Sequence, residues 1–248
     1  MNNGKVKVPT GKALEKRIDT VIKIVYLIFN EGYNAVDRET LIKKDTCCEA
    51  MRLNMVLIKS KLFEDSRLEA LMALMCFQSS RFDSRIGEKG QLLTLEEQDR
   101  THWDEDLVRM GKYYLDQSTD GIISEYHLQA ALAAHHSLAP SYEETDWKQI
   151  LKLYDVLMKI RPDAIVKLNR VVAFSKVHGA AKAINELGQL PLKELNKNHL
   201  YYAICASLYQ QIGSNKKAQE FYKKALALTI NKSEEIYLKN KLSATATF

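Results

Sequence analysis

The sequence predicts an all-α protein, in which a helical N-terminal subdomain with a small β-hairpin insertion is followed by a superhelix of paired helices. Apolar residues recur at helical spacing along most of the 248 residues, which is the primary signal of amphipathic helices. Ten glycines and four prolines leave little turn-forming material, so long helices should dominate. We place the N-terminal subdomain at residues 1–120, with the hairpin near residues 85–95, and the helical repeats at residues 121–248.

Three helices are expected near the N-terminus, over residues 10–31, over residues 39–61 and from residue 66 onward. Gly32 is expected to stop the first helix in the left-handed conformation. Ser66 and Glu69 have the spacing of a capping box at the start of the third helix. A fourth helix is expected after Thr101, which we assign as its cap, and residues 117–121 form the predicted boundary between the subdomains.

The helical pattern breaks between residues 85 and 95. Gly87 and Gly90 enclose a charged tip, and an apolar run of β-prone residues follows. Glycines beside such a run are typical of a short β-hairpin, which we predict here.

Residues 126–154 predict two helices joined by a short turn. Ala130, Ala131 and Ala134 give the first helix a small-residue face on which a neighbour can pack closely. Asp146 is placed to cap the second helix, whose apolar residues fall on one helical stripe. Paired helices of this kind are typical of repeat architectures rather than of enzyme pockets.

The second half of the chain contains a repeat with the 34-residue tetratricopeptide period. The pattern covers two successive predicted helices, with Tyr202, Ala206 and Tyr209 on the first and Ala218, Tyr222 and Ala225 on the second. Tyr154 precedes Tyr222 by 68 positions, which is twice the period. The middle unit is degenerate, because Gly188 and Pro191 occupy its matching positions. We therefore predict two or three imperfect repeats in a tetratricopeptide-like α-superhelix, a shape whose concave surface usually binds protein or peptide.

Positive charge is concentrated toward the C-terminus. The formal net charge is +5, and residues 193–248 supply the excess with nine lysines and four glutamates. These lysines are expected on solvent-facing sides of helices, without interleaved aromatic residues. We therefore expect no direct DNA binding by this segment, although a basic segment also suits an acidic protein surface.

The sequence also indicates where the protein works. Its longest apolar run, residues 24–29, is far shorter than the roughly 20 residues needed to span a bilayer. The first residues lack the apolar core of a signal peptide, so a cytoplasmic location without membrane association is expected. The four cysteines form no C-x-x-C pair and are interpreted as buried free thiols: Cys47, Cys48, Cys76 and Cys205.

Sequence motifs for a metal site, a cofactor or a catalytic group are absent. His127 and His135 lie two helical turns apart, too far to hold one metal ion, and His135 and His136 point about 100° apart. Walker, dinucleotide-binding and nucleophile-elbow motifs are also missing. We therefore predict no reaction, no cofactor and no bound metal.

Four short polar clusters provide the candidate binding residues. Each cluster alone suits a helix cap or a solvated helix end, but together they are expected to line one cleft where the subdomains meet. Tryptophan and arginine contribute most to interface energy, so Arg100→Ala or Trp147→Ala is expected to weaken partner binding while the fold survives; Trp147 suits a core role equally well. The ten residues are Asn30, Glu31, Gln98, Asp99, Arg100, Trp103, Gln129, Trp147, Asn169 and Arg170.

Five stretches of the chain are similar to one protein family. They are residues 25–33 with Phe29-Asn-Glu-Gly-Tyr33, residues 95–104 with Gln98-Asp-Arg100, residues 126–154, residues 164–173 and residues 208–228. They resemble the C-terminal, tetratricopeptide-containing region of bacterial extracytoplasmic-function (ECF) RNA polymerase sigma factors, and the resemblance extends over residues 8–240. It implies a non-catalytic role in transcription initiation, through contacts with the sigma-factor DNA-binding domains, the RNA polymerase core or a regulator.

The chain departs from that family at its N-terminal end. Sigma factors of this type carry two DNA- and polymerase-binding domains before the equivalent of residue 8, where this chain has seven residues. We therefore expect a fragment, the product of a split gene or a stand-alone regulator. Two other functions stay open: a tetratricopeptide scaffold unrelated to transcription, and a small-molecule sensor or enzyme that uses the cleft between the subdomains.

Overall fold

The computed structural model describes residue 11 and residues 16–34, 42–60, 64–191 and 195–245. Within these residues the fold is all-α, with eleven α-helices, two short 3-10 helices and no β-strand, which confirms the predicted fold class. The hairpin expected near residues 85–95 is reduced to one antiparallel bridge between Ile86 and Leu92. The helix starts expected at residues 10 and 39 lie outside the described residues. No described helix is both long enough and apolar enough to cross a membrane.

Helix α4 (Ser66–Ser79) is the centre of the N-terminal half. All of its residues from Ala70 to Phe77 are buried, and a helix that is apolar on every side is stable only when other helices surround it. Four helices pack on it: α2 (Ile18–Tyr33), α3 (Lys44–Ser60), α5 (Glu105–Gln117) and α6 (Glu125–Ser137). The 3-10 helices η1 (Phe82–Ser84) and η2 (Arg100–His102) lie in the connection from α4 to α5.

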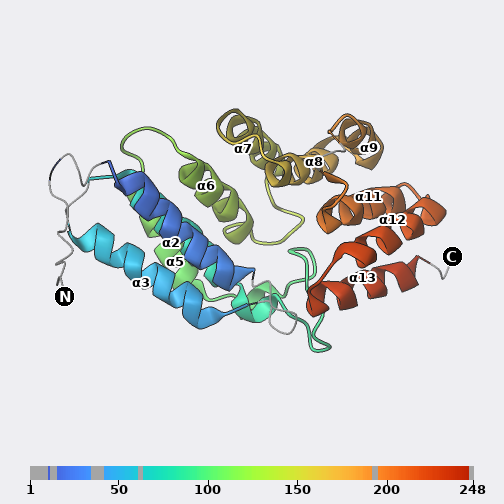
Figure 1. Cartoon of the computed structure of the whole chain (residues 1–248), viewed down its shortest axis with the longest axis horizontal. Helices are drawn as coiled ribbons and strands as arrows, with labels where there is room; N and C mark the ends of the chain where they lie inside the picture. Colours follow the sequence, from blue (N-terminus) through green and yellow to red (C-terminus); the bar gives the residue numbers. More distant parts are fainter. Residues whose placement is uncertain (1–10, 12–15, 35–41, 61–63, 192–194, 246–248) are drawn as a thin grey trace, which may run out of the picture.

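Six helices form the C-terminal half, and each packs mainly on its neighbours in the sequence. They are α7 (Trp147–Ile160), α8 (Ala164–His178), α9 (Ala180–Gly188), α11 (His199–Gln211), α12 (Asn215–Leu228) and α13 (Lys232–Ala244). Their apolar residues form three successive clusters, which contain Leu157, Leu187 and Tyr222 in turn. Figure 1 shows the six helices as an arc from α7 at the top to α13 at the lower right. Such neighbour-to-neighbour packing is the organisation of a helical repeat array.

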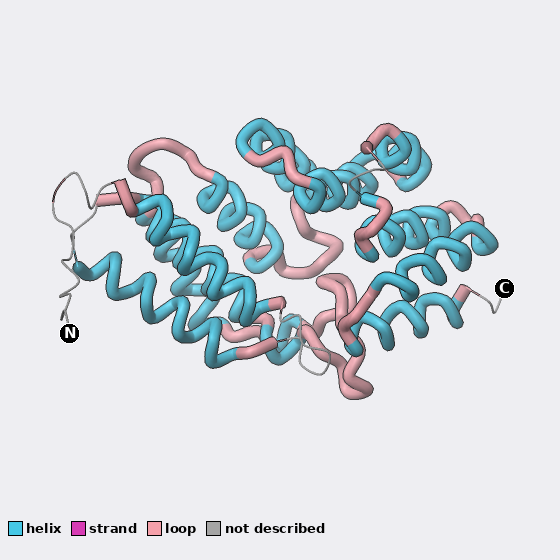
Figure 2. The backbone as a smooth tube through the Cα atoms, in the orientation of Figure 1, coloured by secondary structure: helices cyan, strands magenta, loops and turns pink. Residues whose placement is uncertain are grey.

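A bridging loop, residues 85–99, connects the N-terminal half to the last helix of the array. The Leu92 amide donates a 3.0 Å hydrogen bond to the carbonyl oxygen of Ser233, and Glu97 forms a 2.9 Å ion pair with Lys241. Both partners belong to α13. Figure 2 shows loops between the two groups of helices. The array is thus attached to the N-terminal half at both ends, through α6 against α7 and through the bridging loop against α13.

Two predicted helix caps are wrong. Helix α4 is capped by Asp65, whose carboxylate accepts a hydrogen bond from the Arg67 amide, and not by a capping box at Ser66. Helix α5 is capped by Asp104, since Thr101 belongs to η2. In both cases an aspartate with extended backbone immediately precedes the helix, and aspartate is among the preferred N-cap residues.

Gly32 does not end helix α2 but lies within it, without a left-handed backbone. Its role is close approach: a Cβ atom there would lie 2.7 Å from Cys47 Sγ, 2.9 Å from the Cys47 amide nitrogen and 2.9 Å from the Lys43 carbonyl oxygen. The start of α3 therefore packs directly against the backbone of α2.

Cys47 is buried at this contact, whereas Cys48 is exposed, which corrects the expectation that all four thiols are buried.

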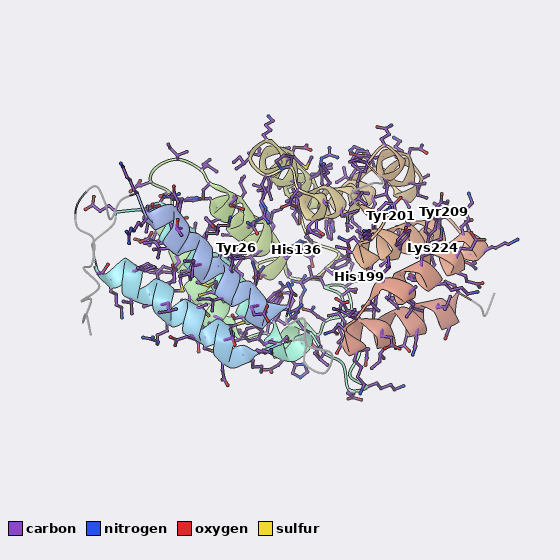
Figure 3. The ribbon with its side chains drawn as sticks, in the orientation of Figure 1. Tyr26, His136, His199, Tyr201, Tyr209 and Lys224 are labelled. Carbon is purple, nitrogen blue, oxygen red and sulfur yellow. The ribbon has the colours of Figure 1, made fainter. Side chains whose placement is uncertain are left out.

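Aromatic rings accompany the lysines of α12, contrary to the expectation from the sequence. Lys217 Nζ lies 5.0 Å from the centroid of the Tyr209 ring, and Lys224 Nζ lies 5.2 Å from that of Phe221. Phe221 and Tyr209 stack with centroids 5.4 Å apart, and Figure 3 labels Tyr209 and Lys224 on this part of the array. Because the rings stack on each other, the cluster holds α11 against α12.

Candidate functional site

The two halves enclose a cavity of about 680 Å³, which we term the central cleft. One side is formed by α2, α4, α6 and the bridging loop, and the other by α7, α8, α11, α12 and α13. Figure 3 shows Tyr26 and His136 on the N-terminal side. A concave site between two structural units is a common place for ligand or partner binding.

Three helices each turn one stripe of side chains toward the central cleft. The stripes are Gln129, Leu132, Ala133 and His136 on α6, Ile165, Asn169, Val172 and Lys176 on α8, and Leu200, Ala203, Ser207 and Gln211 on α11. Their spacings of three and four residues correspond to one face of a helix. Because α6, α8 and α11 are the first members of the pairs α6–α7, α8–α9 and α11–α12, the first helices of the pairs supply the inner wall.

An aromatic cluster surrounds Lys176 in this wall. Its Nζ lies 4.8 Å from the centroid of the Tyr142 ring and 5.8 Å from that of Trp147. Trp147 meets Tyr142 and His136 edge-to-face, at centroid distances of 5.4 and 5.3 Å. Glu96 of the bridging loop forms a 3.6 Å ion pair with Lys176. The cluster gives the cleft flat apolar faces beside polar edges, as interfaces that use tyrosine and tryptophan do.

A chain of polar contacts connects α2, α6 and the turn between α7 and α8. The Tyr26 hydroxyl donates a 2.7 Å hydrogen bond to Gln129 Oε1, and Gln129 Nε2 donates to Glu125 at 3.5 Å. Glu125 also accepts a 2.7 Å hydrogen bond from Arg161. Arg161 forms a further ion pair with Asp163, the N-cap of α8. These contacts hold the Gln129 amide in one orientation at the edge of the cleft.

Two arginines flank Trp103 beyond the end of α4. The Trp103 side chain is 7% exposed, and the guanidinium carbons of Arg81 and Arg100 lie 5.9 and 4.6 Å from its ring centroid. Arg100 donates two 2.8 Å hydrogen bonds, to the carbonyl oxygens of His136 and Ala139. Burial, together with the positive charges of Arg81 and Arg100, lowers the pKa of His136 to about 3. The imidazole is therefore neutral at physiological pH.

The structure brings only part of the ten predicted site residues together. Gln129, Trp147 and Asn169 line the central cleft. Arg100 and Trp103 line a second cavity of about 300 Å³. The other five line neither cavity: Asn30, Glu31, Gln98, Asp99 and Arg170.

Three of those five residues have local structural partners. Arg170 forms ion pairs with Asp155 and Glu186, which connect α8 to α7 and α9. Asp99 caps η2, and the Gln98 amide donates a 3.0 Å hydrogen bond within the bridging loop. These contacts agree with the alternative interpretation of the polar clusters as caps and helix ends.

Several cleft residues were not recognised in the sequence: Tyr26, Gln78, Arg81, Tyr142 and Lys176. The one local signal is the pair Gln78 and Arg81, two long polar side chains that follow the apolar run of helix α4. The other three reach the cleft only through the packing of distant helices.

None of the three buried cysteines lines the central cleft. Among the described residues, no group of three or more His, Cys, Asp or Glu side chains is arranged to hold a metal ion. Burial raises the pKa of Cys47 and Cys76 to about 12 and that of Cys205 to about 11. These thiols therefore remain protonated at neutral pH and are poor nucleophiles. The cleft offers hydrogen bonds, ion pairs and aromatic faces.

Comparisons with known proteins give two similarities. Residues 17–119, the region from α2 to α5, match the Family of unknown function (DUF6596). Over 234 residues the chain is 34% identical to an uncharacterized protein of Rhizobium meliloti (strain 1021). That match covers 93% of this chain and 54% of the relative, so the chain spans about half of the relative's length.

Proposed function

We propose that this chain is a non-catalytic protein-interaction module, and that its central cleft receives a segment of a partner protein. The observation that carries the proposal is the aromatic lining of the central cleft, where Tyr26, Tyr142 and Trp147 face a cavity of about 680 Å³. Aromatic side chains in concave sites are frequent energetic centres of recognition. The concave face of a helical repeat array also usually binds proteins or peptides.

The same proposal places this module in the regulation of transcription initiation. Its support is the resemblance to the C-terminal region of ECF sigma factors over residues 8–240. The similar Rhizobium meliloti protein has room for further domains, because the match accounts for 54% of its length. The partner segment would come from the sigma-factor DNA-binding domains, the RNA polymerase core or a regulator.

Site-specific photo-crosslinking tests this function. A photo-crosslinking amino acid is placed at Gln211, which lines the cleft, and in a matched control at Lys182, an exposed residue of α9 outside it. Each variant is mixed with purified ECF sigma DNA-binding domains and RNA polymerase core from the same bacterium. We expect crosslinks from Gln211 and none from Lys182. If Gln211 crosslinks to neither the sigma DNA-binding domains nor the polymerase core, these transcription partners are excluded. Equal crosslinking from Gln211 and Lys182 would exclude the cleft as the binding site.

The volume of the cleft also favours a second function, small-molecule sensing. Ligand pockets typically measure about 300–1,000 Å³, and the central cleft measures about 680 Å³. Native mass spectrometry of the purified chain tests this alternative. A bound small molecule at one-to-one stoichiometry that is lost in Trp147→Ala would support a sensor, and a ligand-free mass for the wild type would count against it.

A further inference from the structure

Arg81 is a cation of the central cleft that has no carboxylate partner among the described residues. The other cations that line the cleft are paired: Arg161 with Glu125, Lys176 with Glu96 and Lys241 with Glu97. Arg81 instead donates a 2.9 Å hydrogen bond to the hydroxyl of Tyr33. Its Nε has no hydrogen-bond partner in the part of the chain that the structure describes. A buried donor of a charged group that has no acceptor is energetically unfavourable.

Two further polar atoms without partners lie on the same side of the cleft. Within the described residues, Gln78 near the end of α4, three residues before Arg81, has an unpaired Oε1, and His136 on α6 has an unpaired Nδ1. Both side chains line the central cleft with Arg81. A glutamine amide can present either its oxygen or its nitrogen, and a neutral imidazole can donate from Nδ1. Helix α4, the turn after it and helix α6 therefore supply three potential donors to one side of the cleft.

The surroundings of these donors indicate an anion carried on a larger molecule. Trp103 lies against Arg81, with 5.9 Å between guanidinium carbon and ring centroid, and Trp147 lies 5.3 Å from the ring of His136. From there the cleft continues along α8 and α11, where Asn169 and Gln211 line it. Amide side chains can hydrogen-bond both the N–H and the C=O groups of an extended peptide backbone.

We propose that the central cleft binds an extended acidic peptide segment, and that one aspartate or glutamate carboxylate of this segment sits against Arg81, between Gln78 and His136. Arginine suits this task because its planar guanidinium can present two parallel N–H groups to a carboxylate. This inference rests on the proposed function, since it specifies the chemistry of the partner segment.

Pools of tryptophan-free hexapeptides test the inference, with one position fixed as glutamate, glutamine or lysine and the others varied. Binding is followed by intrinsic fluorescence, because the chain has two tryptophans and both lie beside the donor group: Trp103 and Trp147. We expect the glutamate pool to bind at least about tenfold more tightly than the glutamine pool, since charge-assisted hydrogen bonds are worth about 1.5–3 kcal/mol. Equal affinities, or no binding of any pool, would overturn the proposal.

Variants assign the preference to one residue. In Arg81→Gln the preference for glutamate should fall below about twofold, whereas the matched control Arg52→Gln, whose exposed side chain pairs with Glu49 on α3, should retain it. Circular dichroism checks folding. If Arg81→Gln does not fold, Arg81→Lys serves, which keeps the charge without the planar fork and should retain a reduced preference of about threefold. A glutamate preference that is unchanged in the folded variant would show that Arg81 is not the site.

Two further measurements separate the remaining outcomes. Glutarate and inorganic phosphate are titrated as free anions, and tighter binding of either one than of the glutamate pool would replace the peptide with a small-molecule anion. The crosslink from Gln211 is measured in Arg81→Gln and in the wild type. A partner crosslink without any glutamate preference rejects this inference and leaves the proposed function standing, whereas a glutamate preference without a crosslink rejects the transcription partners alone.

Discussion

The guanidinium of Arg100 lies 2.8 Å from the carbonyl oxygen of His136, although the two residues are 36 positions apart in the chain. A second hydrogen bond of the same length reaches Ala139. Together they put a positive charge at the C-terminal end of α6, where unpaired carbonyl groups and the helix dipole favour a cation. The contact ties η2 to α6.

Replacing Arg100 by alanine should destabilise the fold as well as alter the site. Two hydrogen bonds from a charged donor are lost, and we expect the free energy of unfolding to fall by about 2 kcal/mol. Urea unfolding followed by circular dichroism measures the change. The control Arg109→Ala removes a surface ion pair with Glu105 and should stay within about 0.5 kcal/mol. Equal stability of Arg100→Ala and the wild type would mean that solvent replaces both bonds without cost.

Tyr26→Phe should remove the hydrogen bond that holds Gln129. The hydroxyl donates at 2.7 Å across 103 residues of sequence, and a half-buried acceptor left without its donor costs about 1 kcal/mol. Thermal and urea unfolding measure the loss. Tyr113→Phe is the matched control, since Tyr113 is 58% exposed, and it should leave stability within about 0.5 kcal/mol. A loss of the same size in both variants would refute the role of this contact.

Gly32→Ala should separate α2 from α3. The added Cβ would approach the Cys47 amide nitrogen and the Lys43 carbonyl oxygen to 2.9 Å each, and backbone atoms cannot rotate away as side chains do. We expect a destabilisation of about 1–3 kcal/mol. Gly188→Ala, at a position with nothing within 4 Å of the added carbon, should be neutral or stabilising by up to about 1 kcal/mol. Urea unfolding should give a lower midpoint for Gly32→Ala than for Gly188→Ala. The reverse order would contradict the prediction.

His136 should make the fold sensitive to acid. Burial and the charges of Arg81 and Arg100 lower its pKa to about 3, whereas an unperturbed histidine has a pKa of about 6.5. Between these values the unfolded chain binds a proton that the folded chain does not, so stability decreases as pH falls from about 6.5 toward about 3, by up to about 1.4 kcal/mol per pH unit.

Unfolding of His136→Gln between pH 4 and 7 measures this contribution, because the variant should show a shallower dependence of stability on pH than the wild type. His102→Gln, at a side chain that is 70% exposed, is the control for the substitution itself. Identical slopes in all three proteins would assign the acid sensitivity to other groups.

Glu97 and Lys241 should be energetically coupled across the bridging loop. Their side chains are 31% and 34% exposed, and a double-mutant cycle with Glu97→Gln and Lys241→Met should give about 0.5–1 kcal/mol. The pair Glu235 and Lys239, which lies on the surface of α13, should give a smaller coupling, because solvent screens exposed charges. A coupling of zero for the first pair would show that the loop is held by its backbone contact alone.

Local patterns in the sequence predict the helices and some of their ends. Asp146 caps α7 as expected, with its carboxylate 3.0 Å from the Gln149 amide, because an N-cap depends on residues two or three positions away. Ala130 and Ala134 are buried on α6, which packs on α4. These features are set within one or two helical turns, so the sequence shows them directly.

The composition of the central cleft and its surroundings could not be predicted in this way. Arg81, Trp103 and His136 come from three separate segments, and only the packing of α4, η2 and α6 brings them together. Arg170 lies on the mostly apolar helix α8, as Arg81 follows the mostly apolar helix α4, but the carboxylate partners of Arg170 lie on α7 and α9. Whether an arginine is neutralised is decided by elements remote in the sequence.

The bridging loop gives this repeat array a mechanical property that open arrays lack. The curvature of an array with one free end can change, because each repeat contacts only its neighbours. Here the last helix, α13, contacts the bridging loop of the N-terminal half through Ser233 and Lys241. The chain therefore forms a closed ring around the central cleft. A segment that binds as we propose would meet walls that are already set at their final separation, so the ordering cost of binding would fall on the segment rather than on this chain.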